Sequence, residues 1–173
     1  MTSYAVLGLL TSGEITGYDL LKQAKLKMSY IWEPTKSHVY RELKRLVTLG
    51  LATERDVAQE HRPDKRLFTI TPSGLEQFKQ WLEKSELEPE SVRSPFLLQF
   101  FFGTQVDRSL LILRLEKYRE NVRAELNLLE DLGTQLKAKT EQLIHYLTLR
   151  AAVHRRNSLI NWTDEAIQAL KAR

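Results

Sequence analysis

One segment near the N-terminus combines a periodic apolar side with a basic side. It is TKSHVYRELKRLVTLG (residues 35–50), and it follows Pro34, which stops any helix that runs through YIWEPT. Its inward stripe consists of Val39, Leu43, Leu46, Val47 and Gly50, which recur at the helical period. The segment predicts a helix over about residues 35–49, which Thr35 or Ser37 can cap.

Two shorter helical patterns precede this helix. The first, SYAVLGLLTSG, ends near Gly13, because glycine adopts a positive φ without strain. The second, TGYDLLKQAKLKM, opens with Thr16 and carries Asp19 three residues later, as in a capping box. The inward residues of these two helices are Ala5, Val6, Leu9, Leu10, Leu20, Leu21 and Ala24.

Two short strand patterns follow the third helix. LATERDV and RLFTIT are rich in residues that favour strands, and the polar segment AQEHRPDK, with Pro63, joins them. A further helix begins at Thr71 and Pro72, and Leu75, Phe78, Trp81 and Leu82 form its apolar side. Three helices followed by a two-stranded wing predict a winged helix-turn-helix, with a linking helix after the wing.

The second half of the chain is almost wholly helical in pattern. The acidic segment SELEPESVRS predicts a boundary between a DNA-binding domain at residues 1–88 and a helical dimerisation and effector domain at residues 92–173. A short apolar helix should run from Ser94-Pro95 to Gly103, and Thr104 and Asp107 should open a long helix. The last helix ends in LINWTDEAIQALKA, and the turn before it lies between residues 133 and 140. The predicted fold class is therefore mainly α.

The long helix carries an apolar seam at nearly coiled-coil spacing. The seam consists of Leu111, Leu115, Tyr118, Val122, Leu126, Leu129 and Leu132. Two antiparallel helices alone would leave much of this seam exposed. The seam therefore predicts a homodimer formed through the C-terminal helices. A protein-interaction module, in which the seam binds another protein's helix, is the alternative.

Several classes of site find no support in the residues. The chain has no cysteine, and its four histidines form no HExxH motif and no close ligand pair. No carboxylate pair has an apolar surround, and no glycine-rich phosphate loop or nucleophile elbow occurs. We expect no enzyme, no metal and no cofactor. No signal peptide is evident and no apolar run could span a bilayer, so the expected compartment is the cytoplasm.

Positive charge favours an acidic partner only in residues 35–66, where it is concentrated. The net charge is +4, yet residues 1–90 hold 13 basic and 13 acidic residues. Residues 35–66 hold eight basic and five acidic residues, a local excess of three. A basic helix side alone is typical of a solvated face, and Glu42 is expected to dilute it. The basic wing beside the helix favours DNA as the partner.

The residues that would face DNA lie on the third helix and on the wing. Ser37, Arg41, Lys44 and Thr48 lie opposite the inward stripe, and Lys36, Tyr40 and Arg45 flank them. The wing, at about residues 58–66, adds His61, Arg62, Lys65 and Arg66. An arginine fork matches two acceptors on guanine, and the other side chains can bind phosphates or base edges.

The chain resembles the PadR-like transcriptional regulators in YAVLGLL, GYDLL, SHVYRELKRLVTLGLA and RPDKRLFTITPSG. Its helical half, with SPFLLQFFFG and INWTDEAIQAL, is similar to the dimerisation region of the longer PadR-like and virulence-activator proteins. The resemblance implies a dimeric repressor whose recognition helix enters the major groove of a twofold-symmetric operator. It places Tyr18, Ser37, His38, Tyr40, Lys44, Arg62 and Lys65 at the DNA.

Two points stay open at the level of sequence. Many members of that family carry proline after the tyrosine that matches Tyr40, whereas this chain carries Arg41, which we interpret as an added base or phosphate contact. PadR-like proteins often respond to phenolic acids or other aromatic compounds, which implies a small aromatic effector. Trp32, Trp81 and Trp162 could line a pocket for one, but packing is the more common role of tryptophan. No effector-binding residue is assigned.

Overall fold

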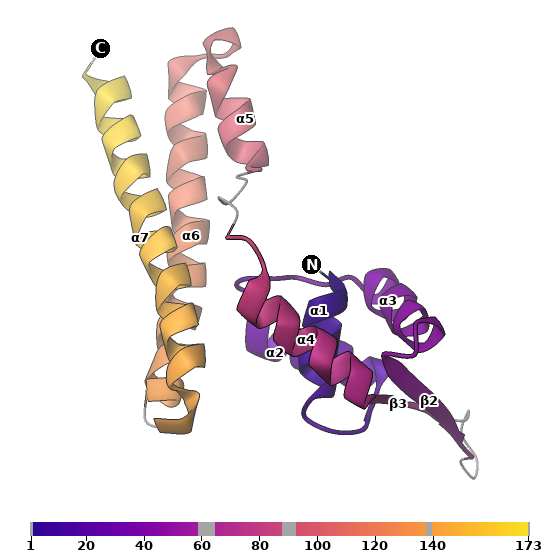
Figure 1. The fold of residues 1–173 in the computed structure, drawn as a ribbon. Helices are drawn as coiled ribbons and strands as arrows, with labels where there is room; N and C mark the ends of the chain where they lie inside the picture. The colour runs from indigo at the N-terminus through magenta and orange to yellow at the C-terminus, as the bar shows by residue number, and fades with distance from the viewer. Residues whose placement is uncertain (1, 59–64, 88–92, 138–139, 173) are drawn as a thin grey trace. The chain divides into compact units, whose positions relative to one another are not determined.

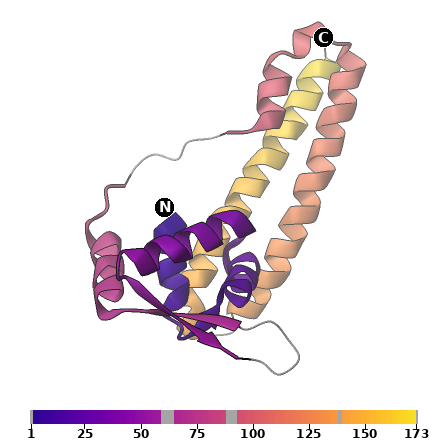
Figure 2. The same cartoon turned by 90° about the vertical axis from the view of Figure 1, so that its right-hand side faces the viewer.

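The computed structural model describes residues 2–58, 65–87, 93–137 and 140–172 (Figure 1). The chain divides into two compact units, Met1–Pro89 and Glu90–Arg173. The first unit holds four helices and a small antiparallel sheet, and the second consists of helices (Figures 1 and 2). The predicted fold class, a winged helix-turn-helix followed by long helices, is confirmed. The predicted site residues His61 and Arg62 lie outside the described residues.

The helices of the first unit begin where the sequence provides caps. They are α1 (Thr2–Leu10), α2 (Gly17–Met28), α3 (Lys36–Thr48) and α4 (Pro72–Lys84). The hydroxyl oxygens of Thr16, Thr35 and Thr71 accept hydrogen bonds from main-chain N–H groups in the first turns of α2, α3 and α4. These bonds satisfy donors that no helical carbonyl can reach, which explains the three starting points.

The sheet has one more strand than the sequence predicts. Strands β2 (Ala52–Val57) and β3 (Lys65–Ile70) form the expected hairpin. A third strand, β1 (Ile15–Thr16), pairs with the other edge of β3, with Ile15 opposite Phe68. The strand order is β1-β3-β2. Two residues are too short to produce an alternating pattern, so β1 has no signal of its own in the sequence.

The predicted inward stripes meet in one core. Val6 and Leu10 of α1, Leu20 of α2, and Val39 and Leu43 of α3 are fully buried together. Phe68 of β3 closes this core against the sheet. Burial at positions separated by three, four and seven residues removes one side of each helix from water and leaves the other side free to bind. The core therefore fixes which side of α3 faces outward.

The second unit is a helical hairpin with a short helix packed on it. Its elements are α5 (Pro95–Phe101), the 3-10 turn η1 (Gly103–Gln105), α6 (Arg108–Lys137), the 3-10 turn η2 (Thr140–Gln142) and α7 (Leu143–Lys171). Helices α6 and α7 run antiparallel side by side (Figures 1 and 2). Leu115, Val122 and Leu126 of the predicted seam are buried, and Val153 and Ile160 of α7 pack against the last two.

Polar and aromatic contacts also hold this hairpin together. Ion pairs join α6 to α7 at Arg119–Asp164, Glu125–Arg156 and Glu116–Lys171. Phe96 of α5 stacks on Tyr118 with ring centroids 4.1 Å apart, and Phe100 meets Trp162 edge to face at 5.5 Å. Trp162 thus contributes to packing, one of the two roles considered for it.

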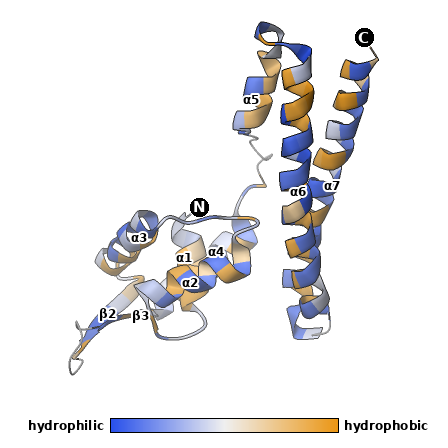
Figure 3. Cartoon of the chain, turned by 180° about the vertical axis from the view of Figure 1, so that it is seen from behind, coloured by the Kyte–Doolittle hydropathy of each residue, from blue (hydrophilic) through white to orange (hydrophobic). Residues whose placement is uncertain are grey.

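Large apolar side chains remain exposed in this unit. Figure 3 shows hydrophobic residues on several sides of α5, α6 and α7. The exposed ones are Leu98, Phe101, Phe102, Val106, Leu110, Leu113, Leu128, Leu143, Ile144 and Leu147. Across the described parts of the chain, no helix is both long enough and apolar enough to cross a membrane.

Candidate nucleic-acid interface

An open groove lies between the start of α2, the outer side of α3 and the sheet. Its volume is about 880 Å³. The groove is lined by Thr16, Gly17, Tyr18, Asp19, Tyr40, Lys44, Glu54, Lys65, Arg66 and Phe68. Five of the predicted DNA-binding residues therefore border one groove: Tyr18, Tyr40, Lys44, Lys65 and Arg66. They come from three separate segments of the chain.

Aromatic rings form much of one wall of this groove. The ring of Tyr40 lies against Gly17, where a Cβ atom would come within 2.8 Å of Tyr40 Cε1. Only glycine leaves room for the ring at the first turn of α2. Lys36 Nζ lies 5.9 Å from the centroid of the same ring, at the outer limit of a cation–π contact. Tyr18 is 68% exposed and available to a ligand.

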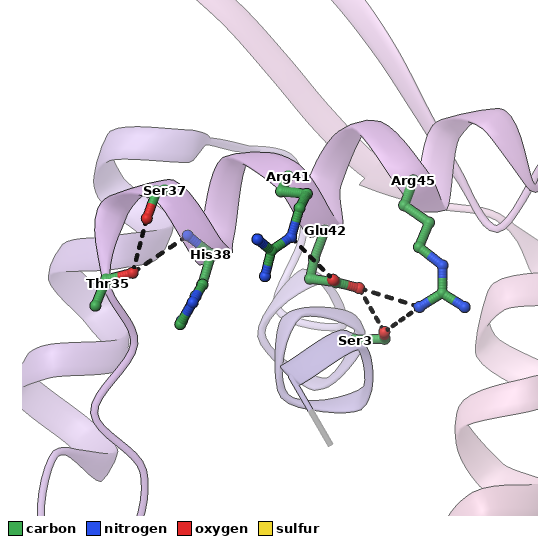
Figure 4. A network of polar contacts seen from close by, with 7 residues as sticks. All are labelled: Ser3, Thr35, Ser37, His38, Arg41, Glu42 and Arg45. Atoms are coloured by element: carbon green, nitrogen blue, oxygen red, sulfur yellow. Dashed lines mark hydrogen bonds and ion pairs between the residues drawn. The ribbon is translucent and has the colours of Figure 1, made fainter.

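The other flank of α3 carries a different arrangement, centred on Glu42 (Figure 4). Glu42 is only 8% exposed, and its carboxylate lies within 4 Å of Arg41 and Arg45 on the same helix, so it offsets basic charge there as expected. The Ser3 hydroxyl on α1 donates a hydrogen bond of 2.6 Å to Glu42 Oε2. A buried carboxylate needs such donors, because burial without them would carry a large desolvation cost.

Two predicted DNA-binding arginines lie at this carboxylate. Arg45 Nη1 donates to Glu42 Oε2 at 3.4 Å and to Ser3 Oγ at 3.2 Å. Arg41 Nε lies 3.9 Å from Glu42 Oε1, and the side chain of Arg41 is 66% exposed. The Ser3 hydroxyl bond, aided by Arg45 and Arg41, holds the pKa of Glu42 below its ordinary value. Glu42 is therefore a carboxylate at neutral pH.

The wing also contains an arginine held by carboxylates. Arg66 Nε donates to Asp56 Oδ1 at 2.9 Å, and Arg66 Nη1 lies 3.4 Å from Glu54 Oε2. All three residues are on the side of the hairpin that carries Phe68, because Asp56 faces Arg66 and Glu54 faces Phe68 across the strands. Arg66 therefore borders the groove with its guanidinium already paired to Asp56 and Glu54. In the sequence it is only one more basic residue of the wing.

The opposite side of the sheet carries a separate ion pair. Arg55 donates two hydrogen bonds to Glu14, at 2.7 Å from Nε and 2.6 Å from Nη2. Arg55 faces Leu67 across the strands, so its side chain lies on the side opposite to that of Glu54, Asp56 and Arg66, and neither Arg55 nor Glu14 lines the groove. The hydrogen bonds from Arg55 lower the pKa of Glu14. The pair ties β2 to the residue before β1, across β3.

Sequence reasoning missed Gly17, Ser3 and the role of Glu42. A Glu and an Arg three residues apart on a helix form a common pair, so the Glu42–Arg45 contact had a signal. Ser3 is 39 residues from Glu42, and no local pattern links them. The remaining predicted residues on α3 that lie outside the groove, Ser37 and His38, are exposed near its N-terminus.

Comparison with known proteins identifies the family of the chain. The model of the transcriptional regulator PadR-like family matches residues 6–80, and that of the virulence activator alpha C-terminal region matches residues 92–171. The chain belongs to the PadR-like family. Like other family members, it is a DNA-binding transcriptional regulator and not an enzyme.

Similar proteins match over nearly the full length of the chain. The negative transcriptional regulator PadR of Bacillus subtilis is 29% identical over 171 residues, which cover 95% of this chain and 94% of that protein. The crystal structure of B. subtilis PadR with operator DNA has a TM-score of 0.86 at 28% identity and covers 97% of this chain and 98% of that one. Its complex with p-coumaric acid has a TM-score of 0.82 at 28% identity, covering 98% of both chains.

Proposed function

We propose that this PadR-like protein is a homodimeric repressor, with α3 in the major groove of its operator and the wing on the adjacent backbone or groove. The groove that brings Tyr18, Tyr40, Lys44 and Lys65 together carries this proposal. The likeness to the operator complex of B. subtilis PadR supports it. Repression follows the description of that relative as a negative regulator. The protein acts in the cytoplasm, where bacterial operators are accessible.

Different residues have different roles in the proposed complex. Arg41 lies at the centre of the outer side of α3 and contacts a base or a phosphate. Lys36, Ser37, His38 and Lys44 border it along the helix and bind phosphates or base edges. Tyr18, Lys65 and the wing residues His61 and Arg62 bind the backbone. Arg45 and Arg66 are already held by carboxylates. We therefore assign them a different role from that of Lys36, Lys44 and Lys65.

The exposed apolar side chains of the second unit support dimerisation. Phe101 is 79% exposed and Leu113 is 61% exposed. Large exposed apolar areas typically mark protein–protein contacts. In a twofold dimer the two recognition helices would read half-sites about 34–36 Å apart, or a multiple of that spacing.

A small aromatic acid is the proposed effector. The support is the crystal structure of B. subtilis PadR with p-coumaric acid. An effector that binds the DNA-free form more tightly shifts the population away from the operator by its difference in affinity. Adding p-coumarate to the DNA complex and following fluorescence anisotropy tests this part, with benzoate as the first variant ligand.

Footprinting on the DNA upstream of the protein's own gene tests the core of the proposal. The expected result is a protected region with twofold symmetry and a length that fits two half-sites. Binding should weaken steeply with salt, with a log–log slope of about −0.9 per phosphate contact. Absence of any protection, together with capture of another protein's helix by the second unit, would favour the protein-interaction module instead.

A further inference from the structure

The carboxylate of Glu42 occupies an unusual place for an interface that binds a polyanion. It lies between the two arginines of α3, Arg41 and Arg45, within 4 Å of each guanidinium. We propose that Glu42 is a specificity-determining residue: it withholds Arg45 from DNA phosphates and sets the direction of Arg41. This inference rests on the proposed function of α3 as the DNA-reading helix.

The first support is that Glu42 itself is fixed. Its side chain is 11% exposed, and its Oε2 atom accepts a hydrogen bond from Ser3 on a different helix. A surface glutamate would sample many rotamers, whereas this one is held by a partner in α1. The carboxylate can therefore impose a direction on the arginines, which are mostly exposed and would otherwise be free to move.

The second support is the geometry of Arg45. Its side chain is 62% exposed, yet Nη1 points to Ser3 Oγ and Glu42 Oε2 at 3.2 and 3.4 Å (Figure 4). Two acceptors on one nitrogen hold it at the junction of α1 and α3. An arginine used for phosphate contact would need to leave both. Arg45 thus helps to orient α1 and α3, and its positive charge is then less available to DNA phosphates.

The third support is the physics of non-specific binding. Sequence-independent affinity grows with the number of phosphates that a protein neutralises, while base contacts carry the discrimination. By holding Arg45, the Glu42 carboxylate lowers the sequence-independent affinity for DNA. By restraining Arg41, it orients that side chain for a base contact and so favours discrimination between sequences. The pairing of Arg66 with Asp56 and Glu54 on the wing acts in the same direction. Three arginines at the described interface, Arg41, Arg45 and Arg66, are therefore restrained by carboxylates.

The test compares Glu42→Gln with the matched variant Glu14→Gln. Each substitution removes one negative charge paired with arginine in the same unit, but Glu14 and Arg55 belong neither to α3 nor to the lining of the groove. Affinities for the footprinted operator duplex and for an unrelated duplex of equal length are measured over a range of KCl concentrations. Ser3→Ala, which removes the donor that fixes Glu42, serves as a second variant with the charge unchanged.

For Glu42→Gln we expect affinity for the unrelated duplex to rise about three- to tenfold, and its salt slope to steepen by about 0.9, the equivalent of one phosphate contact. Affinity for the operator should rise less, so the ratio of operator affinity to unrelated-duplex affinity should fall. Glu14→Gln should change neither the ratio nor the slope. An unchanged ratio and slope in Glu42→Gln, with the operator still bound, would overturn the inference while leaving the proposed function intact.

A double-mutant cycle with Arg45→Gln identifies the residue through which Glu42 acts. In the Arg45→Gln background, Glu42→Gln should no longer steepen the salt slope. Arg45→Gln alone should leave operator affinity within about twofold, because that arginine is already withheld, and this result stands even if Glu42→Gln fails to fold. A tenfold loss of operator affinity in a folded Arg45→Gln protein would overturn the inference. Failure of the unaltered protein to discriminate any operator would instead remove the proposed function.

Discussion

Gly74 in the first turn of α4 lies so close to the main chain of Leu51 that a Cβ atom on it would come within 2.0 Å of the Leu51 carbonyl oxygen. That carbonyl also accepts a hydrogen bond of 3.0 Å from the Thr71 N–H, which holds it in place. The obstacle is main chain rather than a flexible side chain, so moving it would cost considerable free energy. The close approach fixes α4 on the residue that precedes β2.

We expect Gly74→Ala to destabilise the first unit by about 3 kcal/mol, the upper end of the usual cost of overpacking. Urea unfolding followed by tryptophan fluorescence measures it, because Trp32 and Trp81 belong to this unit. Ser73→Ala is the control: Ser73 is exposed, and the change removes its hydrogen bonds to the Gly50 carbonyl at 3.1 Å and to the Thr71 hydroxyl at 2.9 Å without adding any atom. Equal stability of the two variants would contradict the steric account.

Arg41→Ala and Lys44→Ala should each weaken operator binding without unfolding the protein. Both side chains are exposed and lie outside the buried apolar stripe of α3. A base contact is worth about 1–3 kcal/mol, whereas loss of a phosphate contact reduces the salt slope by about 1. Gel-shift titrations at several salt concentrations separate the two roles. Unchanged binding in both variants would refute the recognition-helix assignment.

Gly17→Ala should weaken DNA binding through Tyr40. The added methyl would come within 2.8 Å of the ring, and the ring must move out of the groove wall. Alanine is otherwise favourable in a helix, so the thermal midpoint should change little. Gly17→Ala in a Tyr40→Leu background provides the control, because the smaller side chain can give way. Equal losses of affinity in both backgrounds would exclude a role for ring displacement.

Acid should destabilise the first unit partly through Glu42 and Glu14. Both pKa values are lowered on folding by hydrogen-bond donors, from an ordinary value of 4.5. A lowered pKa means that the stabilisation is fully present above that ordinary value and is lost as pH falls through the lower folded value. The Glu14→Gln, Glu42→Gln double variant should therefore show a flatter fall of stability below about pH 4.5. Chemical unfolding between pH 7 and pH 3 measures the difference.

Phe101→Ser should shift the protein from dimer to monomer. The side chain is 79% exposed in the described unit and contributes to the apolar surface assigned to dimerisation. Leu87→Ser is a matched control, because Leu87 is 97% exposed and follows α4 instead of lying on α5 to α7. Light scattering after size-exclusion chromatography gives the mass. A dimer that persists in Phe101→Ser at micromolar concentration would place the contact elsewhere.

The helices could be predicted because their signals are local. Thr16, Thr35 and Thr71 each mark a start, and the inward stripe of α3 identified Val39, Leu43 and Leu46 as buried. The sequence predicts the turn before the last helix within residues 133–140; α6 ends at Lys137 inside that interval, but η2 extends the connection to Gln142, two residues beyond it. Caps and helical periodicity act over a few residues, and a single sequence records them directly.

The details of the interface required contacts between distant residues. Ser3 meets Glu42 and Glu14 meets Arg55 across 39 and 41 residues. Such contacts depend on how α1 crosses α3 and on the third strand of the sheet, neither of which has a periodic signal. Composition shows Arg45 and Arg66 as positive charges, but it cannot show that carboxylates already hold them. The sequence therefore predicts which residues surround the site better than it predicts which of their charges are already paired.

The short strand β1 determines where the wing can bend. Its two residues pair with Leu67 and Phe68, so the hairpin is three strands wide at that level. Beyond it, Asp56 and Val57 pair only with Arg66 and Lys65. A three-stranded base resists bending more than a two-stranded hairpin, so we expect the hairpin to bend beyond β1 before the groove wall moves. In the proposed complex, this bending would adjust the wing to the width of the DNA groove without a shift of α3.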